Sequence, residues 1–137
     1  MKTFKIFQIH LTDAEVDTIN ETGDHFAVPK QAARLRLQFG TDNPKAADDL
    51  VNDAFTKGYF ENVANIRAND LEGVFEVGNI GPEENIERFS QMHSISVGDV
   101  ILDEDGMMWL TAQVGFQPVR KLVPDMYFFE DELEGVA

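Results

Sequence analysis

The chain contains no cysteine, and this absence excludes a disulfide framework, a thiolate zinc site and a cysteine nucleophile. It also lacks any apolar run near the ~20 residues that a membrane-spanning helix needs. The stretch from Met1 to Gln8 has neither the apolar core nor the cleavage site of a secretion signal. These absences favour a protein of the reducing cytoplasm, here the cytoplasm of a host cell, with no membrane contact.

Basic side chains are scarce, because the 137 residues include 11 Lys and Arg against 25 Asp and Glu, a formal net charge of −14. Residues 1–45 carry six side chains of each sign, so residues 46–137 carry five basic and 19 acidic ones and hold the whole imbalance. Such a field repels phosphate backbones and anionic lipids, which disfavours direct binding to nucleic acid or membranes. A host protein with a basic surface is the natural partner, although an acidic surface also serves solubility alone.

Catalytic motifs are missing as well. The histidines lie at positions 10, 25 and 93, and none has a metal-ligand spacing such as HExxH. His93 precedes Ser94, a base beside a hydroxyl, but there is no Gly-x-Ser-x-Gly elbow, and sequence neighbours rarely align for nucleophilic catalysis. No glycine-rich phosphate loop occurs. We therefore expect a protein that is not an enzyme and that uses no metal or cofactor.

The acidic segment Asp103–Gly106 resembles the first half of an EF-hand calcium-binding loop. An EF-hand would need an acidic ligand at position 101 and a bidentate Glu at position 112, where this chain has Ile101 and Ala112. The pattern fails at both ends, so a solvated turn is the better interpretation. Asp-Gly between two apolar runs predicts a β-hairpin, and Gly115 interrupts the second run as a bulge.

Hydrophobic periodicity predicts one α+β domain over residues 1–124, in which N-terminal strands interleave with helices and a C-terminal hairpin or meander completes the sheet. Strands are expected over 3–9, 33–39 and 59–66, helices from 13, 44 and 70, and a short helical turn over 82–88. The strand at 33–39 rests on strict alternation of apolar residues with Arg34, Arg36 and Gln38. Residues 125–137 are expected to form an acidic tail that carries Tyr127, Phe128 and Phe129.

The helix starts rest on cap signals. The first helix has Thr12 followed three residues later by Glu15, which is a capping box. The second has Asn43 before a proline, and the third has Asn69 followed three residues later by Glu72.

Three segments between Asp70 and Val119 carry a family resemblance: Asp70–Asn79 (DLEGVFEVGN), Met92–Ile101 (MHSISVGDVI) and Val114–Val119 (VGFQPV). Together they resemble the YodL-like domain of phages, plasmids and integrated mobile elements, in which the block from His93 to Val100 is the most specific part. The resemblance implies a phage or mobile-element accessory protein. It supplies no catalytic residues, because no activity is attached to the domain. Physically, the block is a fold-specifying turn, with Asp99 as a cap and the residues after it in the core.

Two classes of function remain open. In the first, the chain is a viral accessory protein that binds and modulates a host protein through its acidic surface, which could also mimic the charge of DNA. The expected contacts are carboxylates of the short helical turn and of the hairpin: Glu83, Glu84, Glu87, Asp103, Glu104 and Asp105. In the second, it is a structural or assembly protein that self-associates through an apolar surface to form a homo-oligomer.

Overall fold

The structure is a computed structural model that describes residues 1–121, so the expected tail with its three aromatic residues lies outside the described residues. In chain order the elements are β1 (Lys2–Ile9), α1 (Asp13–Thr22), η1 (His25–Ala27), α2 (Pro29–Phe39), α3 (Pro44–Thr56), β2 (Phe60–Ala68), α4 (Leu71–Asn79), η2 (Glu83–Asn85), β3 (Ile86–Arg88), β4 (Val100–Leu102), β5 (Met108–Thr111) and β6 (Phe116–Val119). The η elements are single 3-10 turns.

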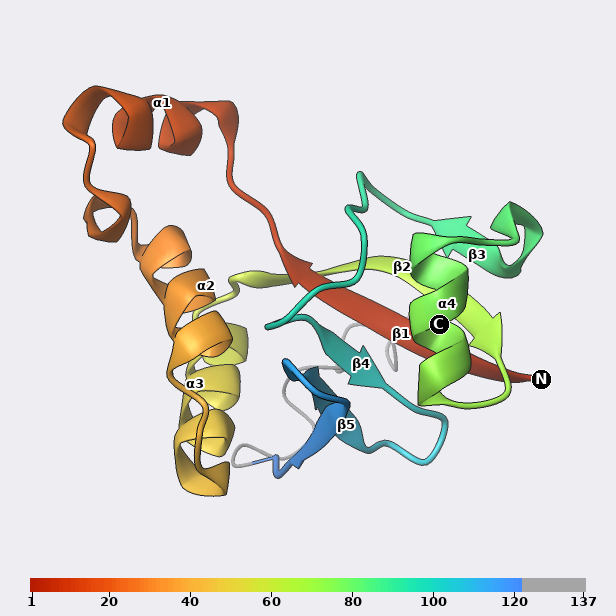
Figure 1. Ribbon diagram of the computed structural model, residues 1–137. Coiled ribbons are helices and arrows are strands. Elements are labelled where there is room, and N and C mark those ends of the chain that lie inside the picture. The colour runs from red at the N-terminus through yellow and green to blue at the C-terminus, as the bar shows by residue number, and fades with distance from the viewer. Residues whose placement is uncertain (122–137) are drawn as a thin grey trace, which may run out of the picture.

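All the described strands join one antiparallel sheet in the order β3-β2-β1-β4-β5-β6. Strand β1 lies in the middle, paired with β2 on one side and with β4 on the other (Figure 1). Strands β4, β5 and β6 follow one another as the predicted meander. The α+β class is confirmed, because the helices are inserted between strands of an antiparallel sheet.

The sheet has a hydrophobic core on each face. Successive side chains of a strand point to opposite faces, and β1 uses both. Ile6 packs into one cluster with Val74 of α4, whereas Phe7 packs into the other with Val51 of α3 and Leu37 of α2. Each of these side chains is at least 95 % buried, so the central strand is covered on both sides.

Helix α1 stands away from the sheet as an arm (Figure 1), and Ile19 is its one buried side chain. Its predicted capping box is confirmed: the Glu15 backbone N–H donates to Thr12 Oγ1 at 3.2 Å, and the Thr12 N–H donates to Glu15 Oε1 at 2.8 Å. The same carboxylate accepts a hydrogen bond from Lys30 of α2, which ties the arm to the next helix.

Replacing the cap residue tests this helix start. Thr12→Ala removes one half of the capping box, and we expect it to lower the free energy of unfolding by ~1 kcal/mol. Thr18→Ala is the matched control, because it makes the same chemical change inside the helix, where alanine is the better helix former. Urea unfolding followed by circular dichroism measures both. Equal stability of the Thr12 variant and the wild type would show that the box does not stabilise the helix.

The predicted strand over 33–39 is wrong, because these residues complete helix α2. Pro29 at the start of the helix favours this outcome, since its fixed φ suits the first turn and its missing N–H has no partner to lose there. Alternation misled because Ala, Leu, Arg and Gln are all good helix formers. Phe39 is consequently 74 % exposed, and Arg34 and Arg36 do not share one basic face.

The short helical turn expected over 82–88 is confirmed only at its start, and its extension to Arg88 is wrong. Those residues form the 3-10 turn η2 and then the edge strand β3, in which Glu87 lies opposite Asn65 of β2. Side chains of consecutive strand residues alternate between faces, so Glu83, Glu84 and Glu87 do not line one side of a helix.

The break at Gly115 is a chain reversal and not a bulge. Gly115 has φ 74°, which glycine adopts without strain, and its carbonyl oxygen accepts a hydrogen bond from the Ala112 N–H at 3.0 Å. This tight turn leads from β5 into β6. The predicted Asp-Gly hairpin is confirmed between β4 and β5. Its loop has three residues, because the Gly106 N–H donates to the Asp103 C=O and the Asp103 N–H donates to the Met107 C=O.

Candidate functional site

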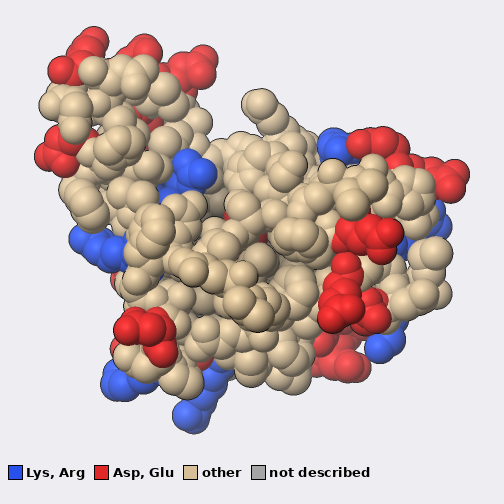
Figure 2. Space-filling model, viewed as in Figure 1, with Lys and Arg blue, Asp and Glu red and all other residues tan. Residues whose placement is uncertain are grey.

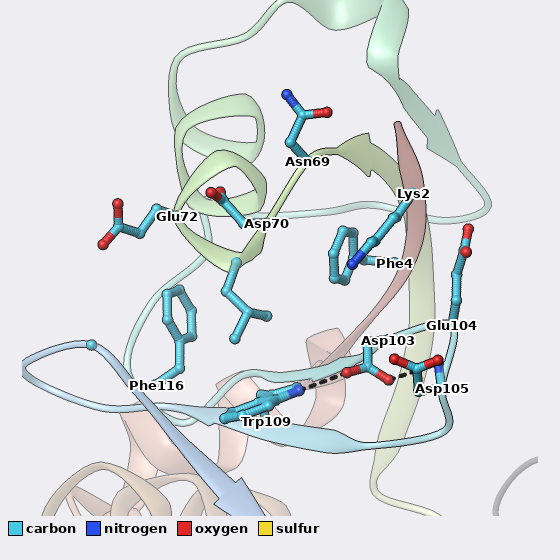
Figure 3. A pocket seen from close by; sticks show the side chains of 12 residues that line it. Lys2, Phe4, Asn69, Asp70, Glu72, Asp103, Glu104, Asp105, Trp109 and Phe116 are labelled. Carbon is cyan, nitrogen blue, oxygen red and sulfur yellow. Dashed lines mark hydrogen bonds between the residues drawn. The ribbon is translucent and has the colours of Figure 1, made fainter.

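A pocket of about 650 Å³ opens between the start of α4 and the β4–β5 hairpin. Sheet topology places it there. Lys2 at the beginning of β1 pairs with Ala68, the last residue of β2, and Lys5 pairs with Leu102, the last residue of β4. The chain segments that follow β2 and β4 therefore leave the sheet at the same end. These two segments form opposite sides of the pocket (Figure 3).

The pocket is strongly acidic. Its lining contains five carboxylates and a single cationic side chain, that of Lys2. The carboxylates come from both segments: Asp70, Glu72, Asp103, Glu104 and Asp105. This excess of negative charge in a concave surface favours a cationic ligand, because such a surface concentrates the field of its charges.

Aromatic side chains line the same pocket. Phe4 comes from β1, Trp109 from β5 and Phe116 from β6. Trp109 lies opposite Pro118, so Phe116 is its diagonal neighbour on the same face of the sheet. Both rings are half-buried and pack against the core cluster below α4. Figure 3 shows the three rings around one open space, with Asp103 beside Trp109, while the Glu72 side chain points away from that space.

Asp103 organises the hairpin side of the pocket. Its Oδ1 accepts hydrogen bonds from the backbone N–H groups of Asp105 and Met107, both at 2.9 Å, and its Oδ2 accepts one from the Trp109 indole at 3.0 Å. Both oxygens are thus engaged within the protein, as expected of a turn that stabilises itself. No group of three or more His, Asp and Glu side chains within residues 1–121 could hold a metal ion.

The remaining carboxylates differ in their availability. Asp70 caps α4 by accepting the Gly73 N–H at 2.7 Å, and Glu104 accepts the Thr3 N–H at 2.7 Å. Glu72 and Asp105 are exposed, and their carboxylates have no hydrogen-bond partner among the described residues. These two are the acids that a ligand could engage without breaking a contact.

Only half of the expected contact residues lie at this pocket. Asp103, Glu104 and Asp105 line it, whereas Glu84 and Glu87 line a separate hollow of about 320 Å³ beside Arg67. Glu83 is paired with Arg88, and the hydrogen bond from that guanidinium lowers the pKa of the Glu83 carboxyl. Its charge is therefore compensated, and the group around η2 is a weaker candidate surface than the hairpin.

Sequence reasoning missed the other side of the pocket. The segment with Asp70 and Glu72 was interpreted only as a helix start, and Trp109 and Phe116 were not singled out as site residues. Those local roles are real, since Asp70 does cap α4, in place of the expected Asn69. The useful signal was the single tryptophan beside an acidic turn, because a half-buried aromatic ring next to carboxylates suits a cation.

A second polar cluster lies on the other half of β1. Gln8 is fully buried, and its side-chain amide donates to the His93 C=O at 2.9 Å and to Asp99 Oδ2 at 3.0 Å, while its Oε1 accepts the His93 N–H at 3.2 Å. Asp99 Oδ2 also accepts the Ser96 N–H at 3.0 Å, which confirms the predicted cap role. The cluster fastens the segment before β4 onto the central strand.

Burial gives this cluster unusual protonation behaviour. Desolvation raises the pKa of Asp99 to about 6, despite the hydrogen bonds that it accepts from Ser96 and Gln8. The ring of His10 stacks on that of His93 with 5.5 Å between centroids, and burial, followed by the nearby His93, lowers the pKa of His10. Because Gln8 and Asp99 are both buried and bonded to each other, these shifts bear on stability.

The His93–Ser94 pair does not form the arrangement of a base and a nucleophile. His93 Nδ1 lies 2.9 Å from the backbone oxygen of Ser94, and its nearest carboxylate oxygen, on Asp99, is 4.0 Å away. No hydroxyl group of residues 1–121 is hydrogen-bonded to the His93 ring. The pair lies in the irregular segment before β4, where Gln8 holds the backbone of His93.

Comparison with protein-family models, curated proteins and solved structures finds no match to this chain. Within residues 1–121, no helix is both long and apolar enough to cross a membrane.

Proposed function

We propose that this chain is a non-enzymatic accessory protein of a phage or mobile element, which binds and modulates a basic host protein through the pocket between α4 and the β4–β5 hairpin. The observation that carries the proposal is the lining of that pocket, with five carboxylates, three aromatic rings and one lysine. The family resemblance supplies the phage or mobile-element context. The host cytoplasm is the expected place of action.

The charge distribution favours a protein partner. A net charge of −14 repels nucleic acid, and a pocket of about 650 Å³ is within the range that holds a ligand or a segment of chain. DNA mimicry would require extended rows of acidic groups. On the face of the molecule that Figure 2 shows, the acidic side chains lie in separate groups, including one over α1 and one around α4. The pocket therefore fits a localised basic surface of a partner protein better than it fits the long basic groove of a DNA-binding protein.

Self-association is the second candidate, and one observation favours it. Phe39 and Val114 are 74 % and 94 % exposed and line one hollow of about 370 Å³ together with Val97. Exposed apolar side chains that share a hollow are typical of contact surfaces. Sedimentation of the wild type and of a Phe39→Ser/Val114→Ser variant tests this candidate. A wild-type oligomer that the variant lacks would establish it.

The proposed function is tested by capture from a bacterial lysate with two variants of equal charge change. The pocket variant, Glu72→Gln/Asp105→Asn, removes the two free carboxylates of the pocket. The arm variant, Asp17→Asn/Glu21→Gln, removes two exposed carboxylates of α1. All four side chains are exposed, so both variants should keep the wild-type melting temperature within a few degrees.

We expect the pocket variant to capture its basic partner several-fold less than the wild type, and the arm variant to change capture by less than about twofold. Raising the salt from about 50 mM to about 300 mM should weaken capture by the wild type, because screening shortens the reach of the pocket's field. A partner whose capture is the same with the pocket variant and at both salt concentrations would contradict the proposal.

A further inference from the structure

We infer that the pocket holds an arginine side chain of the partner, with its guanidinium against the ring of Trp109. This inference rests on the proposed function and adds the chemical identity of the anchoring group. Three features of the pocket support it: how the indole is held, which carboxylates are free, and how large the pocket is.

The indole of Trp109 is held by its edge. Its Nε1–H donates to Asp103 Oδ2 at 3.0 Å, and Asp103 is itself fixed by two backbone N–H groups of the hairpin. A hydrogen bond at the edge of the ring fixes the orientation of the indole and leaves the faces of the ring free of that contact. Trp109 is half-buried and lines the pocket (Figure 3). A planar group that enters the pocket can therefore stack on the indole ring.

The free carboxylates complement a guanidinium. Glu72 and Asp105 border the pocket on opposite sides and have no hydrogen-bond partner among residues 1–121. Asp105 lies on the hairpin close to Asp103, which bonds Trp109, whereas Glu72 points away from the open space (Figure 3). Guanidinium is planar, stays protonated, stacks on aromatic faces and donates five hydrogen bonds, whereas the ammonium of lysine is a compact and strongly hydrated charge. An aromatic ring that lies beside hairpin carboxylates, of which Asp105 is free to accept, therefore favours arginine over lysine.

The size of the pocket indicates that the arginine arrives on a polypeptide. At about 650 Å³ the pocket is larger than one side chain needs, and it is bordered by the exposed residues of the β4–β5 turn and by the start of α4. The extra space fits the residues that flank the arginine. With four negative charges in excess on its lining, the pocket favours flanking residues that are basic too.

Trp109 makes the inference directly measurable, because it is the chain's only tryptophan and lies in the pocket itself. The probes are three blocked tripeptides: triarginine, trilysine and tricitrulline. Citrulline has the shape of arginine without its charge. Each is titrated into the whole protein at about 50 mM salt while tryptophan emission is recorded. We expect a saturable change with triarginine, at least about fivefold weaker binding of trilysine, and none of tricitrulline.

The two charge-matched variants serve as controls. The pocket variant should bind triarginine at least about tenfold more weakly than the wild type, and the arm variant should bind it within about twofold of the wild type. Phe116→Leu, which removes the second ring while keeping an apolar side chain, should reduce the preference for triarginine over trilysine.

The outcomes separate this inference from the proposed function. Equal affinity for triarginine and trilysine, together with loss of both in the pocket variant, would overturn the arginine preference and leave an acidic docking pocket in place. Equal effects of the pocket and arm variants on every peptide would overturn both. If tricitrulline bound as tightly as triarginine, the charge of the guanidinium would not contribute to binding, and the inference of an arginine ligand would be overturned.

Discussion

Gln8→Ala should lower the free energy of unfolding by about 3 to 5 kcal/mol. Gln8 is fully buried, and its amide satisfies the backbone N–H and C=O of His93 as well as one oxygen of Asp99. Truncation leaves these buried groups without partners and opens a cavity beside the central strand. Chemical denaturation followed by circular dichroism measures the loss.

Gln38→Ala provides the matched control. Gln38 lies on α2 and is only half-buried, so we expect the same change there to alter stability by less than about 0.5 kcal/mol. If Gln8→Ala were as mild as its control, the segment before β4 would not depend on the Gln8 amide. The role assigned to that cluster would then be wrong.

Asp99→Asn should change how stability depends on pH. Burial raises the pKa of Asp99 from 3.8 to about 6, so between those pH values the folded protein holds a proton that the unfolded chain has released. The wild type therefore loses stability as the pH rises through this window. The shift of about two pH units corresponds to a loss on the order of 2 to 3 kcal/mol. Asparagine cannot titrate, and it can still accept the Ser96 N–H.

The free energy of unfolding is measured as a function of pH for the wild type and for Asp99→Asn. The difference between the two isolates the contribution of Asp99. The pKa of His10 is lowered, so His10 acts in the opposite direction and removes stability as the pH falls below 6.5, but it does so in both proteins. Wild-type stability relative to Asp99→Asn should thus fall between about pH 4 and about pH 6 and be level above that. A difference that stays constant over this range would show that Asp99 ionises without penalty in the folded state.

The sequence was most informative where structure is determined locally. The capping box at Thr12, the cap at Asn43 and the Asp-Gly hairpin all depend on residues within five positions of one another, and all three are present. The strand over 33–39 was predicted from a local pattern as well. It failed because Pro29 and the helix-forming residues after it favour a helix, and this helix also places Leu37 in the core despite the alternation.

The sites could be predicted only in part, because they depend on contacts between distant segments. Asp105 and Glu72 line one pocket since β2 and β4 both flank β1 and end at the same end of the sheet. Gln8 and Asp99 are 91 positions apart and meet for the same reason. Strand order is set by the whole sheet and cannot be read from alternation, so the hairpin acids were found and their aromatic neighbours were not.

The most direct test of the central claim follows Trp109 emission while the captured host partner associates with the protein. If the partner docks in the pocket, its binding should change the emission, and the association rate constant should fall at least about tenfold between about 50 and 500 mM salt. The pocket variant should associate more slowly at low salt and show a shallower dependence on salt. A partner that binds without affecting Trp109, at a rate that salt does not alter, would contradict the proposed docking.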